Sequence, residues 1–192
     1  MESKWVFNEI ATITERNIQL LKSTFSKYSE VQLNWKPNAV TWSINEIFAH
    51  LNAYSAFYNH KFHEKIDATK FRKPKDQFTP SPLGKSAWVS MKLGNARNVK
   101  RKFKAPKDYN PTLTPELVHA DELQRRIAAE VDFLSIIEKS VAVSLKRVKI
   151  PLSMSRLVKL RLGDALLFVA YHADRHMEQA LAISKSPKFP KK

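Results

Sequence analysis

The stretch FVAYHADRHMEQALAI, residues 168–183, combines an apolar helical pattern with two histidines four positions apart. The residues that share its inner side recur at three- and four-residue steps: Ala165, Val169, His172, His176 and Ala180. Each residue turns an α-helix by about 100° and advances it by about 1.5 Å, which places His172 and His176 about 40° apart around the axis and roughly 6 Å apart along it. We therefore expect both imidazoles to face the protein core, where both can reach one ion.

The composition favours a single helical domain. The 192 residues are 43% hydrophobic and 27% charged, which suits one globular core. Only 3 glycines are present, which argues against an all-β fold and against a glycine-rich nucleotide loop. The absence of cysteine excludes disulfides, thiolate metal sites and a cysteine nucleophile. A polar start and the lack of any run of 18 apolar residues predict a cytoplasmic protein without a transmembrane segment.

Four segments have the periodicity of amphipathic helices: residues 3–28, 44–67, 114–143 and 162–184. Ser43 and Glu46 have the spacing of a capping box before the second segment, and Thr114 followed by Pro115 predicts the start of the third. The fourth begins after Arg161, where a serine or threonine cap is usual. We predict an all-α fold, a four-helix bundle with an up-down-down-up path and a long crossover between the second and third helices.

Two connections are longer than a simple bundle needs. The crossover, residues 68–113, far exceeds the usual helix-to-helix link, and within it SAWVSMKLGNARNVKR (86–101) predicts a short amphipathic helix. The second, LKRVKIPLSMSRLVK (145–159), contains β-branched residues and a proline that favour an extended or irregular path. We expect one domain over residues 1–184, followed by a basic, frayed tail at 185–192.

A third histidine is predicted to face the core from another helix. His50 follows Ile47 by three positions and precedes Tyr54 by four, so it lies on the inner side of the second helix. Three buried imidazoles on two helices either share a metal ion or each find a hydrogen-bond partner in the core, and the spacing alone leaves both alternatives open. The remaining histidines fall off the inner stripes and are expected at the surface: His60, His63 and His119.

Two segments, NWKPNAVTWSINEIFAHL (34–51) and LGDALLFVAYHADRHMEQA (162–180), resemble the DinB-like superfamily, also called the DinB/YfiT type. The resemblance covers nearly the whole chain. It implies a four-helix bundle in which one histidine of the second helix and an H-x3-H pair of the fourth hold a divalent metal, here His50, His172 and His176. It also implies a transferase or isomerase that uses a low-molecular-weight thiol such as bacillithiol or mycothiol.

Three imidazole ligands favour a catalytic metal site over a structural one, because they leave at least one coordination position open. Without a sulfur ligand, Zn²⁺, Ni²⁺, Fe²⁺ and Mn²⁺ all remain candidates. The open position could bind water, which leads to hydrolysis, or a thiol, which leads to thiol transfer. We therefore expect either a thiol S-transferase or a hydrolase that acts on a small molecule, with the catalytic residues unidentified.

The outer shell of such a site has two candidate residues from the sequence. Glu46 and Gln179 lie one turn from a proposed ligand, although Glu46 is also explained as a helix cap and Gln179 as a solvent-facing residue. Tyr54 and Tyr171 either line a pocket and donate a proton or belong to the core. The two charged residues between the histidines of the fourth helix are expected on a solvated face: Asp174 and Arg175.

The charge suggests a competing function. The chain carries a net charge of +15, and residues 68–111 hold twelve Lys and Arg against two Asp. The segment KRKFK places Lys100, Arg101, Lys102 and Lys104 beside a phenylalanine, a pattern that can contact phosphates and stack on bases. The alternative is therefore a basic module that binds nucleic acid or another anion and has a non-catalytic histidine core. The same charge could instead attract an anionic substrate or be a solvated surface, and a homodimer is also possible.

Overall fold

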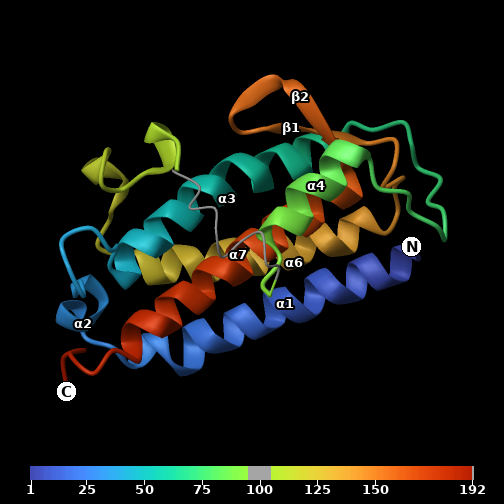
Figure 1. Ribbon diagram of the computed structural model, residues 1–192. Helices are drawn as coiled ribbons and strands as arrows, with labels where there is room; N and C mark the ends of the chain where they lie inside the picture. The colour runs from blue at the N-terminus through green and yellow to red at the C-terminus, as the bar shows by residue number, and fades with distance from the viewer. Residues whose placement is uncertain (95–104, 192) are drawn as a thin grey trace.

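The computed structural model describes residues 1–94 and 105–191, and within them the protein is mostly helical with one small two-stranded sheet. The long helices lie side by side (Figure 1): α1 (Ser3–Ser23), α3 (Ile44–Asp67), α6 (Glu122–Ser140) and α7 (Leu162–Ser184). α3 packs on α6, α6 on α1, α1 on α7 and α7 on α3, so these helices enclose a common interior. The all-α prediction is confirmed in its main part, and the sheet amends it.

Two clusters of buried apolar side chains fill this interior. The first takes side chains from all of the long helices, among them Ile10, Phe62, Phe133, Leu166 and Tyr171. The second lies further along α7 and includes Leu21, Phe25, Phe48, Ala173 and Met177. Each such side chain contributes about 1.5–3 kcal/mol on burial. Because the first cluster reaches Tyr171 and the second starts at Ala173, His172 lies at the boundary between them.

The first predicted helix is shorter than expected. α1 ends at Ser23 and is followed by a 3-10 turn, Phe25–Lys27, and by a short helix α2, Glu30–Asn34. Ser29 caps α2: its hydroxyl accepts from the Gln32 amide, and the Gln32 side chain accepts from the Ser29 amide. This capping box, which the sequence prediction missed, begins a separate helix after the 3-10 turn.

The predicted capping box at the start of α3 is confirmed, whereas the predicted start of the third helix is wrong. Ser43 accepts from the Glu46 amide, and the Glu46 carboxylate accepts from the Ser43 amide. Thr114 precedes only a 3-10 turn, Pro115–Leu117, and α6 starts at Glu122. Proline fixes φ near −65°, a value that 3-10 and α-helices share, so the pattern did not separate them. α6 also ends at Ser140, before the predicted Val143.

Both long connections contain regular structure. In the crossover, α4 spans Pro82–Met91 and is capped by the Ser81 hydroxyl, so the predicted helix exists but begins earlier than expected, and its residues 95–101 lie outside the described part. The second connection forms an antiparallel hairpin of β1 (Lys149–Leu152) and β2 (Ser155–Arg161), with a register shift at Pro151/Leu152. Its extended character was predicted, and its pairing was not.

The C-terminal segment is not frayed within the residues described. The Phe189 ring lies 5.2 Å from the ring of Tyr28 and 5.6 Å from that of Trp35, centroid to centroid. The Gln32 side chain donates a hydrogen bond of 2.8 Å to the carbonyl of Pro190. These contacts tie the tail to α2, which the basic composition of KSPKFPKK did not indicate.

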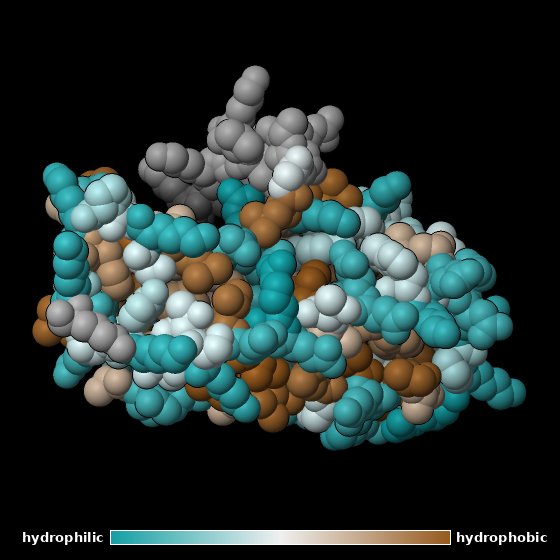
Figure 2. Space-filling model, turned by 90° about the horizontal axis from the view of Figure 1, so that it is seen from below, coloured by the Kyte–Doolittle hydropathy of each residue, from teal (hydrophilic) through white to brown (hydrophobic). Residues whose placement is uncertain are grey.

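The surface is mostly polar, with apolar side chains between the charged ones. Figure 2 shows one face, where teal side chains dominate and brown ones emerge in groups. Among the described residues, the most exposed large hydrophobic side chains are Val31, Val40, Met154 and Leu157. Exposed apolar side chains are normal on a globular protein. No described helix is both long enough and apolar enough to cross a bilayer.

A buried carboxylate fixes the crossover to the start of α7. Asp164 is fully buried and accepts hydrogen bonds from the Ser81 amide and hydroxyl, both at 2.9 Å, and from the Trp88 indole at 3.3 Å. A side chain at Gly84 would not fit, because its Cβ would lie 2.2 Å from the Asp164 carboxyl group. The carboxylate also complements the positive end of the α7 dipole, where Arg161 provides no side-chain cap.

Replacing Asp164 with asparagine is expected to lower the free energy of unfolding by about 1.5–3 kcal/mol, because an amide nitrogen would face donors where a charged acceptor now lies. Urea denaturation followed by circular dichroism measures this. The control is Asp121→Asn, an exposed residue that makes no side-chain cap, for which we expect a change within about 0.5 kcal/mol. Equal midpoints for the two variants would contradict the anchoring role.

Candidate metal centre

Three histidines meet where α3 and α7 pack together. The ring centroids of His50 and His172 are 5.2 Å apart, and each of the two lies 4.7 Å from the ring of His176. One ligand nitrogen from each ring lies within 4.8 Å of the other two. The Nε2 atoms of His50 and His172 are 3.3 Å apart, close to the roughly 3.3 Å expected between two imidazole ligands of one tetrahedral ion. The predicted convergence of the two helices is therefore present, and the group could hold a metal ion.

Backbone and amide oxygens orient two of the rings. His50 Nδ1 lies 2.6 Å from the carbonyl oxygen of Tyr109, and His176 Nδ1 lies 2.9 Å from the Gln179 side-chain oxygen. Because these oxygens only accept, each Nδ1 carries the proton and each neutral ring keeps its lone pair on Nε2. Outer-shell acceptors of this kind are typical of metal-binding histidines. Gln179 has the contact that the sequence suggested, whereas Tyr109 was not identified, because a backbone carbonyl has no residue signature.

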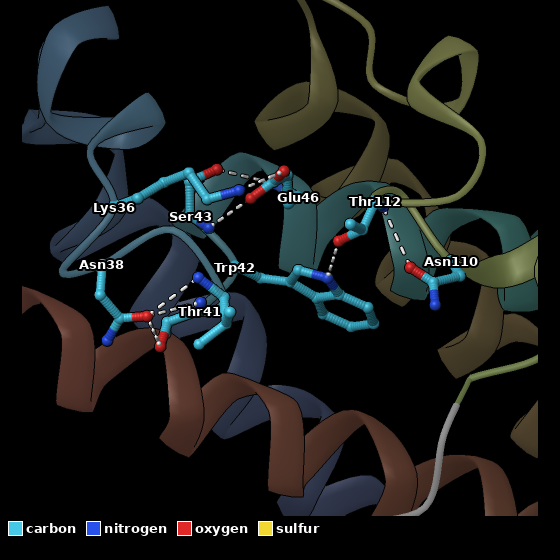
Figure 3. A network of polar contacts seen from close by, with 9 residues as sticks. Lys36, Asn38, Thr41, Trp42, Ser43, Glu46, Asn110 and Thr112 are labelled. Carbon is cyan, nitrogen blue, oxygen red and sulfur yellow. Dashed lines mark hydrogen bonds and ion pairs between the residues drawn. The ribbon is translucent and has the colours of Figure 1, made fainter.

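Glu46, the other suggested outer-shell residue, is engaged elsewhere (Figure 3). One carboxylate oxygen accepts from the Ser43 amide at 2.7 Å, and the other pairs with the Lys36 ammonium at 2.9 Å. The position that it was expected to fill beside His50 is taken by the Tyr109 carbonyl. Glu46 thus acts on the start of α3, which positions His50 two turns further along.

Burial keeps the three imidazoles uncharged. Desolvation lowers the pKa of His50 to about 4, against a weaker opposite effect of the Tyr109 carbonyl. Desolvation, with the charge of a protonated His50 as a smaller contribution, lowers the pKa of His176 to about 3. The pKa of His172 is also well below its ordinary value, through burial and then through its histidine neighbours. At neutral pH all three rings are therefore in the neutral form that binds metals.

Aromatic side chains surround the group. The Tyr54 ring lies 4.7 Å from His172, Phe168 stacks on His172 at 5.9 Å, and Trp42 lies 5.1 Å from His50. The Trp42 indole donates a hydrogen bond of 2.8 Å to the Thr112 hydroxyl, which ties the start of α3 to the end of the crossover (Figure 3). Burial raises the pKa of Tyr54, so that its hydroxyl is protonated at neutral pH. The surroundings are thus mostly aromatic, and the ring of Tyr54, whose hydroxyl hydrogen-bonds to the Ser153 side chain, packs against His172.

The other residues suggested by the sequence lie away from this group. The Tyr171 hydroxyl donates to Glu9 at 2.7 Å, and its ring contacts Trp88. Asp174 was expected on a solvated face, but it is 6% exposed and pairs with Arg16 of α1, because this side of α7 packs on that helix.

The remaining predictions concern residues expected at the surface and the basic residues of the crossover. His60 and His119 are exposed as predicted, while His63 is half-buried and lies 2.8 Å from Asp132. Arg175 is half-buried. The basic residues of the alternative function lie outside the described residues: Lys100, Arg101, Lys102 and Lys104.

The metal-free protein is expected to lose stability on acidification. In the unfolded chain histidine titrates near its ordinary pKa of 6.5, whereas folded His50 titrates at about 4. Between these values only the unfolded state binds the proton, so the stability is complete above pH 6.5 and falls toward pH 4. Urea denaturation should show a loss of about 2 kcal/mol per buried histidine between about pH 7 and about pH 5.

The variants His50→Gln and His60→Gln separate this effect from general acid destabilisation. The first removes a buried ring and should reduce the pH dependence, while the second removes an exposed ring and should leave it unchanged. Identical pH profiles for the two variants would contradict the assignment of His50 as a buried neutral group.

The model of one family, described as the DinB superfamily, matches residues 13–180, a range that includes all three histidines. No curated protein and no solved structure gives a match. The family match covers most of the chain and agrees with the resemblance seen in the two histidine segments. The chain therefore belongs to the DinB superfamily.

Proposed function

We propose that the protein is a divalent-metal-dependent enzyme whose ion is held by His50, His172 and His176. The convergence of three neutral imidazoles from α3 and α7 is the observation that carries the proposal. Three such ligands leave at least one coordination position for a substrate or water. A bound ion would supply Lewis-acid chemistry at that position. Zn²⁺, Ni²⁺, Fe²⁺ and Mn²⁺ are the candidates for a site built from imidazole alone.

Thiol S-transfer is the reaction class that we favour over hydrolysis. Membership of the DinB superfamily supports it, through the thiol-dependent enzymes that the resemblance implies. The aromatic side chains around the site also favour it, because Trp42, Tyr54 and Phe168 limit the access of water. The neutral Tyr54 hydroxyl is the candidate proton donor to a leaving group. The substrate is a small molecule, and the net charge of +15 favours an anionic one.

The scaffold of this enzyme is proposed to be an up-down-down-up four-helix bundle over residues 1–184. The packing of α3 on α6 and of α1 on α7 supports it, as does the course of the chain in Figure 1, where α3 and α6 run opposite to α1 and α7. In this arrangement the crossover, residues 68–113, joins two parallel neighbours and must therefore return along the length of the bundle.

The alternative of a nucleic-acid-binding module stays a prediction from the sequence. It depends on Lys100, Arg101, Lys102 and Lys104, which lie outside the described residues. The cytoplasmic location and the homodimer are likewise sequence predictions. The histidine centre distinguishes the two functions, because a basic module would bind nucleic acid equally well without its histidines.

Protein purified without an affinity tag is expected to contain about one divalent ion per chain. The variants His50→Ala, His172→Ala and His176→Ala each remove a ligand nitrogen and should lower the metal affinity at least about 100-fold. Inductively coupled plasma mass spectrometry measures the metal content, and circular dichroism checks the fold. His60→Ala, which removes an exposed histidine of α3, is the matched control and should keep its metal. Full metal content in His172→Ala would exclude the proposed centre.

A variant of Tyr54 distinguishes an effect on catalysis from an effect on metal binding. Tyr54→Phe keeps the ring against His172 and removes only the hydroxyl, so we expect unchanged metal content and a kcat for thiol transfer lowered about 100-fold. The assay joins a low-molecular-weight thiol to an electrophile, with ester hydrolysis by the same protein measured in parallel. An unchanged kcat would reject Tyr54 as the proton donor, and hydrolysis without thiol transfer would reject the favoured reaction class.

A further inference from the structure

A small cavity lies beside His172 in the interior, and both apolar and polar side chains line it. Its volume is about 10 Å³ for the centre of a water-sized sphere, which is roughly the space that one water molecule needs. Apolar side chains such as Leu51 and Phe133 complete the wall. The polar residues around it come from α3, α6 and α7: Tyr54, Ser55, Tyr58, Arg126, Glu130 and His172.

Arg126 and Glu130 form a buried ion pair at this cavity. Each is 2% exposed, and the Arg126 Nη2 atom lies 3.2 Å from Glu130 Oε1. Arg126 Nη1 also donates to the Ser55 hydroxyl at 3.0 Å. Such a pair is costly to bury and is a poor source of stability compared with apolar side chains of similar volume. Its presence beside a histidine of the candidate metal centre therefore calls for another explanation.

Two polar atoms of this pair lack a hydrogen-bond partner. Arg126 Nε and Glu130 Oε1 are both buried, and neither makes a hydrogen bond of acceptable geometry within the described protein. Buried polar groups are rarely left unsatisfied, and cavities that stay dry have apolar walls. A donor and an acceptor on two residues that line the same water-sized cavity are the elements of a water site.

We infer that this cavity binds one ordered water molecule, which accepts a hydrogen bond from Arg126 Nε and donates one to Glu130 Oε1. Two to four polar partners are typical of buried water, and the Ser55 hydroxyl, which accepts from Arg126, still has a proton to donate at the same wall. The water has a further role that rests on the proposed function. It connects the ion pair to the His172 side of the metal centre, as Tyr109 and Gln179 serve His50 and His176. Arg126 and Glu130 are then positioning residues for His172.

Crystal structures of the metal-free and the Zn²⁺-loaded protein test the water site directly. We expect one density peak within hydrogen-bond distance of Arg126 Nε and Glu130 Oε1 in both crystals. Because the metal-free crystal suffices, this result does not depend on the proposed function. A cavity without density, or one closed by rearranged side chains, would overturn the inference.

A double-mutant cycle tests the same site in solution. Val169→Ile adds one methyl group to the wall of the cavity, and displacing the water should raise the unfolding equilibrium constant about tenfold. The double variant Arg126→Met with Glu130→Leu has no polar pair to hydrogen-bond the water. In this background Val169→Ile should be neutral or stabilising. An equal effect of Val169→Ile in both backgrounds would show overpacking and would overturn the inference. If the double variant does not fold, the wild-type crystals still decide.

The role toward His172 is measured by titration with Zn²⁺. We expect Arg126→Met with Glu130→Leu to bind Zn²⁺ about 10–100-fold more weakly than wild type, and His60→Ala to bind it equally well. Unchanged affinity in the double variant would overturn the outer-shell role and leave the metal centre intact. Failure of the wild-type protein to bind Zn²⁺ would instead reject the proposed function. The water site would then be tested by the electron density of the metal-free crystal alone.

Discussion

The packing of three uncharged imidazoles between α3 and α7, with His50 and His172 buried and His176 half-buried, is the constraint on which the rest of the structure depends. A protonated ring at this position would be a charge without solvent, and desolvation accordingly lowers the pKa of each histidine. The rings converge only if the two helices keep a fixed separation and rotation. The apolar clusters on either side of His172 provide this, since each takes side chains from both helices. Ordinary core packing is therefore what sets the geometry of the candidate site.

The described parts of the crossover support the same centre from outside the long helices. Before the undescribed residues, Asp164 holds α4 against the start of α7 through Ser81 and Trp88. After them, Tyr109 and Thr112 contact the site, the first through its carbonyl and the second through the Trp42 indole. A connection that looks like a long loop in the sequence is thus tied down at both of its described ends, and one of these attachments orients a proposed ligand.

The sequence predicted the parts of the fold that depend on local periodicity. The bounds of α7, the capping box of α3 and the inward direction of His50, His172 and His176 all follow from spacing within one helix. The predictions failed where contacts over long sequence distances decide. Phe189 is held by rings of residues near position 30, and Asp174 is buried because α1 covers it. The partner of His50 is a backbone carbonyl, which any residue type could provide, so no motif could reveal Tyr109.

The position of the histidines between two apolar clusters has a mechanical consequence. The interior consists of two separate clusters of apolar contacts. One surrounds Phe25, Phe48 and Met177, and the other surrounds Phe62, Phe133 and Leu166. An ion held by α3 and α7 at the boundary of the clusters would cross-link these two helices at the level where the two halves meet. Occupancy would then govern how cooperatively the halves unfold and how rapidly amide protons at the far end exchange with solvent. The same centre would couple chemistry to the rigidity of the whole molecule.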